Sequence, residues 1–242
     1  MYKYLLWDID GTVLDFLSAE AYAIRTLFHK YNLGECTDEM LKLYSATNVK
    51  YWDMLARNEI TKPEVLIGRF HEFFGIIGVD TSVAEKFNEE YQVTLGDHIE
   101  FVENAEETLL LYKGKCVLAA VTNGTKVAQK KKLRMSGLDK IFDAVFISED
   151  VGFEKPNKQY FDFVFEKLGI TDKKEVLIIG DSLNADMKGG YDFGIDTCWF
   201  NPQHKSNTLG IPVTYEIDNL NKITDVVTDN TSVNMGSTQW KV

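Results

Sequence analysis

Asp8-Ile9-Asp10-Gly11-Thr12 is the stretch of this 242-residue sequence that decides the fold. It closes an apolar run over residues 4–9, which predicts a buried strand. Because residues two apart in an extended chain point the same way, Asp8 and Asp10 can face one site. Two carboxylates this close repel each other unless a cation joins them, and Mg²⁺ prefers such oxygen ligands. The stretch is therefore a candidate metal site, although Asp and Gly are also common in ordinary turns at strand ends.

Further apolar runs indicate a parallel sheet. They cover residues 116–121, 144–147, 176–179 and, more weakly, 197–200, and each ends in a polar loop. Near-continuous apolar runs of this length are typical of parallel strands that are covered on both faces. Helical patterns separate the later runs, as at residues 157–168, where apolar side chains fall on one face. Strands that alternate with helices predict an α/β fold built from βαβ units.

The chain between the first two predicted strands has a different pattern. It contains helix-length segments at residues 19–31, 38–58, 63–74 and 83–95. A helical block inserted after the first strand of an α/β core predicts a second, smaller domain. We therefore expect a core formed by residues 1–16 and 99–228 and a helical domain over residues 17–98. Residues 229–242 are polar and lack periodicity, so we expect a flexible tail there.

The net charge limits the classes of partner. With 26 basic and 37 acidic residues, the formal net charge is −11. An acidic surface repels the phosphate backbone of nucleic acids, so we expect no nucleic-acid polymer as a partner. A small anionic substrate is still compatible with this charge, because one metal ion and one lysine can reverse the field locally.

The cysteines and the lengths of the apolar segments indicate where the protein acts. Cys36, Cys116 and Cys198 are few, odd in number and far apart, which argues against a disulfide framework and a cysteine-rich zinc site. The first apolar run stops at Asp8, too soon for a signal peptide, and no segment approaches the length of a transmembrane helix. We therefore expect a cytoplasmic protein with no membrane partner.

Three further polar clusters carry side chains that suit phosphate chemistry. Thr122-Asn123-Gly124 follows the second predicted strand and offers a hydroxyl, a carboxamide and backbone N–H groups before a helix. Glu154-Lys155-Pro156 contains a lysine that could balance phosphate charge. Asp181 and Asp186 come directly after another apolar strand. Each cluster also has an ordinary interpretation, as a turn, a solvated lysine or a helix N-cap.

All four clusters follow predicted parallel strands, at whose carboxyl ends ligands bind in open α/β sheets. Four unrelated turns would have no reason to carry two Asp residues, a Thr-Asn pair, a Lys and a further Asp pair in that order. The sequence therefore predicts one site at one edge of the sheet.

The order of these clusters resembles the haloacid dehalogenase (HAD) superfamily. Asp-x-Asp-Gly-Thr, Thr-Asn-Gly, Lys-Pro and Gly-Asp-x-x-x-x-Asp match its full set of four motifs, and the helical insert resembles its C1-type cap. The resemblance covers the core and implies a Rossmann-like parallel sheet, Mg²⁺ as the cofactor, and phosphomonoester hydrolysis through an aspartyl phosphate. Trp7 is the one departure, at a position where Phe is more usual, and it puts none of the chemistry in doubt.

The resemblance implies roles for the acidic motif residues. Asp8 would be the nucleophile and a magnesium ligand. Asp10 would be the general acid and base, and its backbone carbonyl would also meet the metal. Asp181 would complete the metal site.

It also implies roles for the residues around the phosphoryl group. Thr122 and Asn123 would bind that group, and Lys155 would neutralise it and orient the nucleophile. Asp186 would be a supporting residue, which holds Lys155 or a metal-bound water.

The helical insert carries a second, less specific resemblance. Asn48-Val49-Lys50-Tyr51-Trp52, Glu59-Ile60-Thr61 and Arg69-Phe70 resemble the YjjG-type branch, whose members dephosphorylate pyrimidine and noncanonical nucleoside monophosphates. The resemblance implies a small phosphorylated metabolite as the partner, a nucleoside 5′-monophosphate with a pyrimidine base preferred. It also implies that Asn48, Trp52 and Arg69 set the substrate specificity, although helix packing is the more common role for a residue such as Trp52 and a surface ion pair for one such as Arg69.

The sequence leaves other functions open. A sugar-phosphate or phosphoglycolate phosphatase, or a phosphomutase, would carry the same core motifs, and only the cap separates these enzymes from a nucleotidase. A haloacid dehalogenase would use the same nucleophile on carbon, but it needs neither magnesium nor an acid at position 10. A phospho-accepting signalling domain also phosphorylates an Asp at a strand end, but such domains are shorter and lack a helical insert.

Overall fold

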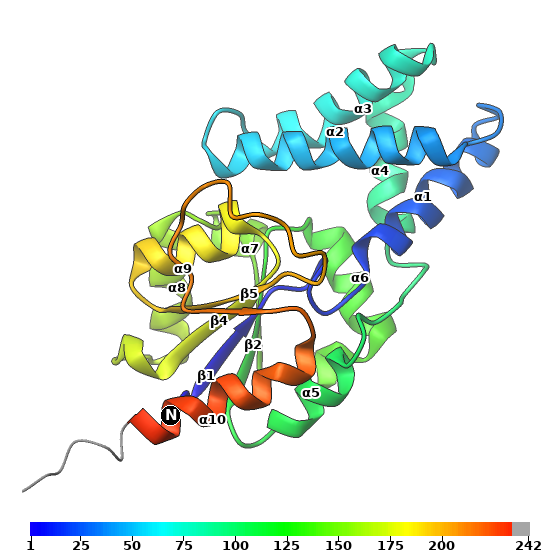
Figure 1. Cartoon of the computed structure of the whole chain (residues 1–242). Helices are drawn as coiled ribbons and strands as arrows, with labels where there is room; N and C mark the ends of the chain where they lie inside the picture. Colours follow the sequence, from blue (N-terminus) through cyan, green and yellow to red (C-terminus); the bar gives the residue numbers. More distant parts are fainter. Residues whose placement is uncertain (234–242) are drawn as a thin grey trace, which may run out of the picture. The chain divides into compact units, whose positions relative to one another are not determined.

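The structure is a computed structural model that describes residues 1–233, and within these residues the strands form one six-stranded sheet (Figure 1). The strands lie in the order β3-β2-β1-β4-β5-β6, and every neighbouring pair is parallel. Their bounds are Tyr4–Trp7 (β1), Val117–Thr122 (β2), Ala144–Ile147 (β3), Val176–Gly180 (β4), Asp196–Phe200 (β5) and Tyr215–Ile217 (β6). The order places β1 between β2 and β4, and it confirms the predicted α/β, Rossmann-like fold.

Two compact units divide the chain. The core unit holds residues 1–14 and 101–123 and the chain from residue 138 onward, and the helical unit holds residues 15–100 and 124–137. The main helices of the core unit are α5 (Ala105–Tyr112), α7 (Ser148–Val151), α8 (Lys158–Leu168), α9 (Lys188–Phe193) and α10 (Ile223–Val233). Those of the helical unit are α1 (Phe16–Lys30), α2 (Asp38–Ala56), α3 (Lys62–Ile77), α4 (Ala84–Thr94) and α6 (Lys126–Ser136).

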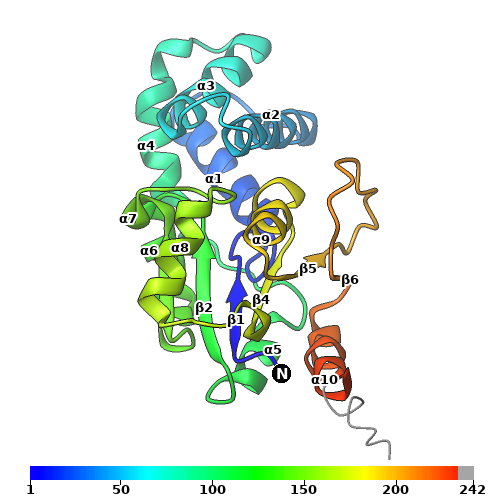
Figure 2. The ribbon, with the colours of Figure 1, turned by 90° about the vertical axis from the view of Figure 1, so that its left-hand side faces the viewer.

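Helices cover both faces of the sheet in the core unit. Leu6 of β1 and Ile178 of β4 share one buried cluster with Phe161 of α8. Helices α8 and α10 lie on opposite sides of the strands (Figure 2). Helix α5 contacts the turn that leads into α10, where the Thr108 hydroxyl donates to the carbonyl of Leu220. This double cover explains why the strands are apolar throughout instead of alternating.

An aromatic core holds the helical unit together. Phe28 of α1, Tyr44 of α2, Phe70 of α3 and Phe87 of α4 are all buried, and their rings meet edge to face, tilted or stacked. Such side chains remove large apolar areas from water, so the four helices form one core of their own. This core gives the inserted helices an independent source of stability.

Short polar side chains set the starts of these helices. Asp15 and Thr37 accept hydrogen bonds from backbone N–H groups in the first turns of α1 and α2, and Thr61 forms a capping box at α3. Helix α3 ends at Gly78, whose φ of 75° is the left-handed conformation that favours glycine. The local sequence therefore explains why these helices begin and end where they do.

The structure adds features that the sequence patterns did not indicate. Strand β6 has only three residues, too few for a recognisable apolar run. Helix α6 belongs to the helical unit, although it lies outside residues 17–98, the range predicted for the helical domain. Helix α10 continues over residues 229–233, and the rest of the predicted tail, 234–242, lies outside the described residues. Within residues 1–233, no helix is long and apolar enough to cross a membrane.

Candidate active site

The carboxyl ends of three central strands bring the predicted motifs together in the core unit. Trp7, the last residue of β1, pairs with Ala120 of β2 and Ile179 of β4. Asp8 extends this ladder by one residue, since its N–H donates to the carbonyl of Ile179 over 2.9 Å. Asp181 directly follows β4 at the same edge. The parallel register therefore places the nucleophile candidate and the last motif side by side, as the sequence predicts.

Lys155 joins two of the predicted acidic residues. Its ammonium group donates to Asp8 Oδ1 over 2.7 Å, to Asp186 Oδ1 over 2.6 Å and to the carbonyl of Val121 over 2.6 Å. The side chain is 1% exposed, and these three acceptors use all three of its N–H groups. Lys155 is thus a fixed cation at the base of the site, and it links β1, β2 and the segment after β4.

The acidic side chains outnumber the cation that they share. Asp8, Asp181 and Asp186 each place a carboxylate oxygen within 4.8 Å of the other two. Burial raises the pKa of Asp8 well above its ordinary value; Lys155 opposes that shift, and Asp186 and Asp181 add to it. Burial and the neighbouring Asp186 likewise raise the pKa of Asp181 to about 7. A further cation would relieve this crowding, so the donor set fits a divalent ion with oxygen ligands.

The pKa of Lys155 shifts the opposite way from what burial alone would cause. Burial lowers the pKa of an ammonium group, but Asp186 and Asp8 raise that of Lys155 above its ordinary value. Lys155 therefore stays positively charged and favours the ionised form of Asp8, which a nucleophile requires.

Two glycines leave room for the carboxylates. At Gly11, where φ is +89°, an added Cβ would lie 2.7 Å from Asp181 Oδ2. At Gly180 an added Cβ would lie 2.3 Å from Asp186 Oδ2. Any larger side chain at either position would displace an acidic residue of the site, so the glycines of the first and last motifs shape it directly.

Asn123 fastens the loop that carries Lys155. Its Nδ2 donates to the carbonyl of Lys155 and its Oδ1 accepts from the N–H of Lys155, each over 2.8 Å. The Ser148 hydroxyl donates to the carbonyl of Asn123 over 3.3 Å. The side chain of Asn123 therefore has a positioning role, and its predicted contact with a phosphoryl group stays a prediction. Thr122 is buried at the end of β2, next to Asn123.

The remaining core residues occupy the turns that frame the site. Asp10 lies in the turn after β1, where its backbone bridges to Leu14, and its side chain is half-buried. Asp186 lies in a π-helical turn, Leu183–Met187, instead of the first turn of a regular helix. Such turns are frequent at functional sites. Its Oδ2 accepts from the N–H of Ser182, which leaves Oδ1 for Lys155.

Two of the three predicted specificity residues are interior to the helical unit. Asn48 and Arg69 are each 2% exposed, and Arg69 Nη1 donates to Asn48 Oδ1 over 2.7 Å. Arg69 also donates to Asn88 Oδ1 over 3.1 Å, and Asn48 Nδ2 donates to Glu20 over 2.9 Å. Arg69 is therefore an interior residue bonded to two amides instead of the surface ion-pair partner that the sequence suggested, whereas Trp52 is half-exposed.

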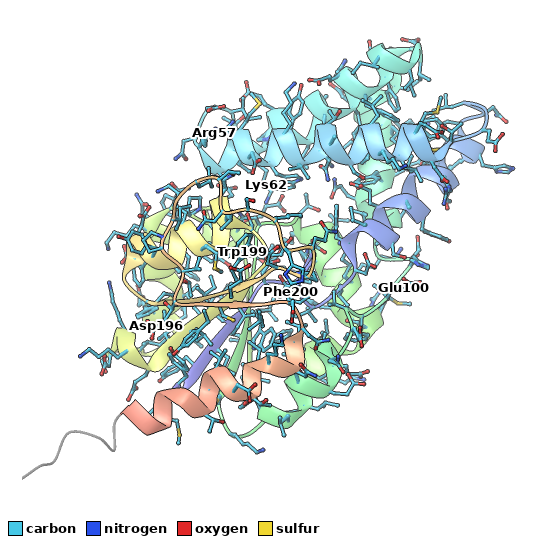
Figure 3. All side chains as sticks on the ribbon, in the orientation of Figure 1. Arg57, Lys62, Glu100, Asp196, Trp199 and Phe200 are labelled. Carbon is cyan, nitrogen blue, oxygen red and sulfur yellow. The ribbon has the colours of Figure 1, made fainter. Side chains whose placement is uncertain are left out.

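Sequence reasoning missed Trp199 as part of the site. This β5 residue donates its indole N–H to the carbonyl of Asp181 over 3.0 Å, and it is labelled in Figure 3. In the sequence it lies in an apolar run and looks like a packing residue. The pairing of Gly180 with Trp199 places it level with the end of β4, and only that register reveals the contact.

Comparison with known proteins identifies the family. The family model for haloacid dehalogenase-like hydrolases matches residues 5–200. The chain belongs to this family. It is 39% identical to the HAD-hydrolase YfnB of Bacillus subtilis over 92% of this chain and 94% of that protein. The crystal structure of YfnB bound to magnesium superposes on this HAD hydrolase with a TM-score of 0.86, at 38% identity, and covers 93% of this chain and 98% of that one.

Two further relatives have named activities. The pyrimidine 5′-nucleotidase PynA of Streptococcus pneumoniae is 32% identical, over 95% of this chain and 96% of that protein. The pyrimidine 5′-nucleotidase YjjG of Escherichia coli is 29% identical, over 92% of this chain and 96% of that protein. These matches include the helical unit as well as the core unit of this HAD hydrolase.

Proposed function

We propose that this HAD hydrolase is a magnesium-dependent phosphatase that acts through a covalent aspartyl phosphate on Asp8. The observation that carries the proposal is the cluster of Asp8, Asp181 and Asp186 around a single ammonium group. Asp8, Asp181 and the backbone of Asp10 would hold Mg²⁺, and Asp186 lies within reach of the same ion. When bound, the ion would offset the negative charge of the phosphoryl oxygens.

The reaction would proceed in two displacements at phosphorus. An Asp8 oxygen attacks phosphorus, the bond to the leaving oxygen breaks, and Asp10 gives its proton to that oxygen. Water then loses a proton to Asp10 and attacks the same phosphorus, which releases inorganic phosphate and restores Asp8. Lys155 would favour the ionised form of Asp8 before the attack, and Asn123 holds the backbone of Lys155 in place.

Asp10 weighs against the haloacid dehalogenase alternative. Displacement of a halide from carbon needs no proton donor for the leaving group, whereas an alkoxide leaving group does. Two solved dehalogenase structures that resemble this chain are 19% and 21% identical to it, so their likeness concerns the fold alone.

For the substrate we propose a nucleoside 5′-monophosphate, with pyrimidine bases preferred. The support is that two pyrimidine 5′-nucleotidases match this chain over nearly its whole length, the helical unit included. Discrimination must come from groups that face the leaving alcohol, because the phosphoryl group is common to all candidates. A small cytoplasmic metabolite is thus the proposed partner.

A substrate screen tests both the magnesium-dependent phosphatase activity and the preference for nucleotides. The purified protein should hydrolyse nucleoside monophosphates with Mg²⁺ and lose all turnover in excess EDTA, with p-nitrophenyl phosphate as a reference substrate. Sugar phosphates and phosphoglycolate belong in the same screen. If the kcat/KM for one of these compounds exceeds that for every nucleotide, the nucleotidase assignment is wrong while the phosphatase mechanism stands. Full turnover in excess chelator would overturn the metal dependence itself.

A further inference from the structure

The chain passes from the core unit into the helical unit in the middle of a predicted motif, residues 122–125. Thr122 and Asn123, the predicted phosphate ligands, are the last residues of their segment of the core unit. Gly124 and Thr125 already belong to the helical unit, and α6 begins directly after Thr125. A contact that holds Gly124 or Thr125 therefore also sets the path by which the chain leaves Asn123.

Two inserted helices hold the two residues that follow Asn123. From α4, Gln92 Oε1 accepts a hydrogen bond from the Thr125 hydroxyl over 2.7 Å. From the first turn of α3, Lys62 Nζ donates to the carbonyl of Gly124 over 3.4 Å, and Figure 3 labels Lys62. The first distance is the usual one for a hydroxyl donor, whereas the second is long. Gln92 is therefore the firmer of the two attachments.

The amide of Gln92 has one orientation. The side chain is 8% exposed, and its Nε2 donates to Asn88 Oδ1 over 3.0 Å, one turn earlier on α4. Arg69 also donates to Asn88 Oδ1, and because a guanidinium has no acceptor, Asn88 must turn its oxygen and not its nitrogen to both neighbours. Gln92 then turns its nitrogen to Asn88 and its oxygen to Thr125, which is 6% exposed. The bond between Gln92 and Thr125 is thus a fixed contact in a buried place.

Asn123 links this contact to the active site. Its amide bonds both backbone polar groups of Lys155, and the Lys155 ammonium donates to Asp8. On the core side, the Ser148 hydroxyl holds the carbonyl of Asn123 over 3.3 Å, which is long for such a bond. If the chain shifts at Thr125, two residues later, Asn123 should shift with it and loosen the loop that carries Lys155.

We propose that Gln92 is a positioning residue, which acts through Thr125 on residues 122–125 and on the loop of Lys155. Its effect on turnover rests on the phosphatase function proposed above, whereas its effect on the loop does not. Asn123 and Lys155 serve the phosphoryl group that every candidate substrate shares. Loss of the Gln92 contact should therefore lower kcat by the same factor for all of them, without changing the preference among leaving groups.

The first test compares Gln92→Met with Thr94→Val. Methionine keeps the length of the side chain but neither accepts from Thr125 nor donates to Asn88. Thr94 is the matched control, because it is a buried residue of the same helix whose hydroxyl donates within α4, to the carbonyl of Glu90 over 2.8 Å. In Gln92→Met, kcat per folded molecule should fall about tenfold on p-nitrophenyl phosphate and on a nucleoside monophosphate alike, and Thr94→Val should stay within about twofold of the wild type.

Variants of Thr125 test the other side of the same bond. Thr125→Ser keeps the hydroxyl and should retain the wild-type kcat, whereas Thr125→Val should lose at least as much as Gln92→Met. Because both side chains act through one bond, the double variant Gln92→Met, Thr125→Val should be hardly slower than Thr125→Val alone. Losses that multiply would overturn the proposal. So would equal kcat in Thr125→Ser and Thr125→Val, a comparison that holds even if Gln92→Met does not fold.

Hydrogen exchange of the intact protein gives a readout that needs no turnover. Mass spectrometry should show severalfold faster exchange in Gln92→Met at the peptides that contain residues 122–125 and Lys155, and no change there in Thr94→Val. A Gln92→Met protein with lower stability but wild-type kcat and wild-type exchange at these peptides would overturn the proposal, because Gln92 would then only support the helical unit. A wild-type protein that hydrolyses no phosphomonoester would instead refute the proposed function, and the exchange rates would still decide the role of Gln92.

Discussion

Each unit of the molecule buries a group of charged side chains, but the two groups are balanced differently. In the core unit, three carboxylates crowd around the one ammonium group of Lys155. In the helical unit, Glu20 is joined to Arg69 through the amide of Asn48, which donates to the acid and accepts from the guanidinium. The first group keeps an excess of negative charge, whereas in the second the charges of Arg69 and Lys132 both act on one acid, Glu20.

The difference separates a binding site from an internal support. Buried charges that lack a counter-charge raise the free energy of the folded chain unless a ligand supplies it. The excess negative charge of the core group therefore suits a cation, as the proposed function requires. The helical group already has its partners, and Arg69 also packs against the rings of Phe70 and Tyr91. Removing a charge should therefore preserve or raise the stability of the protein in the core group, and lower it in the helical group.

Asp8→Asn should have the largest effect on function. Asparagine keeps the shape and still accepts a hydrogen bond from Lys155, but it is no nucleophile, so kcat should fall by at least about 10⁴-fold. Because burial, together with Asp186 and Asp181, raises the pKa of Asp8, its ionised form destabilises the fold, and the variant should have an equal or higher Tm without magnesium. Thermal unfolding and phosphatase assays measure the two effects. A large drop in Tm would instead show that the charge of Asp8 stabilises the folded protein.

That prediction uses residues that the sequence alone could name. Asp8, Lys155, Asp181 and Asp186 were predicted to share one sheet edge, because each follows an apolar strand, and the structure brings them together. The contribution of Asn123 to the loop of Lys155 was not predictable in this way. It depends on the exact distance between two loops that follow different strands, and no spacing in the sequence encodes that distance.

Other features of the structure could not be predicted from the sequence, for similar reasons. Arg69 follows a helical pattern whether it faces solvent or the interior, and only the packing of α1, α2 and α4 around it decides which. The Asn201 side chain bonds the N–H and the carbonyl of Lys205, four residues later in an irregular segment where no periodicity applies. The short strand β6 lies next to that segment and forms only because β5 offers an unpaired edge.

Arg69→Met should have a smaller effect than Asp8→Asn, and it should lower stability instead of activity. At pH 8, where Glu20 is ionised, the change leaves that buried carboxylate with only the charge of Lys132 nearby, so the free energy of unfolding should fall by about 3–5 kcal/mol. Activity on p-nitrophenyl phosphate per folded molecule should stay within about twofold, because Arg69 touches no core residue named above. Arg57→Met is the matched control: Arg57 pairs with Glu59 at the exposed end of α2 (Figure 3), and its loss should cost less than about 0.5 kcal/mol.

Chemical denaturation of both arginine variants, with a phosphatase assay at low denaturant, decides between the two roles of Arg69. A folded Arg69→Met protein that has lost nucleotide activity but keeps activity on p-nitrophenyl phosphate would restore the substrate role. Partial recovery of stability in the double variant Glu20→Gln, Arg69→Met would confirm that the cost comes from the unpaired acid.

The smallest expected effect is the pH dependence of Glu20. Burial raises its pKa to about 7, against an ordinary 4.5, and hydrogen bonds from Ser45 and Asn48 and the charge of Arg69 only partly oppose this. The neutral form is therefore favoured in the folded chain, so stability from this residue is fully present below pH 4.5 and is lost as the pH rises through 7. The loss should amount to about 2 kcal/mol between pH 5 and pH 8. Glu20→Gln cannot titrate, so its free energy of unfolding should fall less over that interval than that of the wild type. Because both proteins share every other titrating group, the difference between their two slopes isolates Glu20. Parallel slopes would mean that Arg69 and the amides hold Glu20 ionised at every pH, and the helical group would then be a true ion pair rather than a neutral acid beside a buried cation.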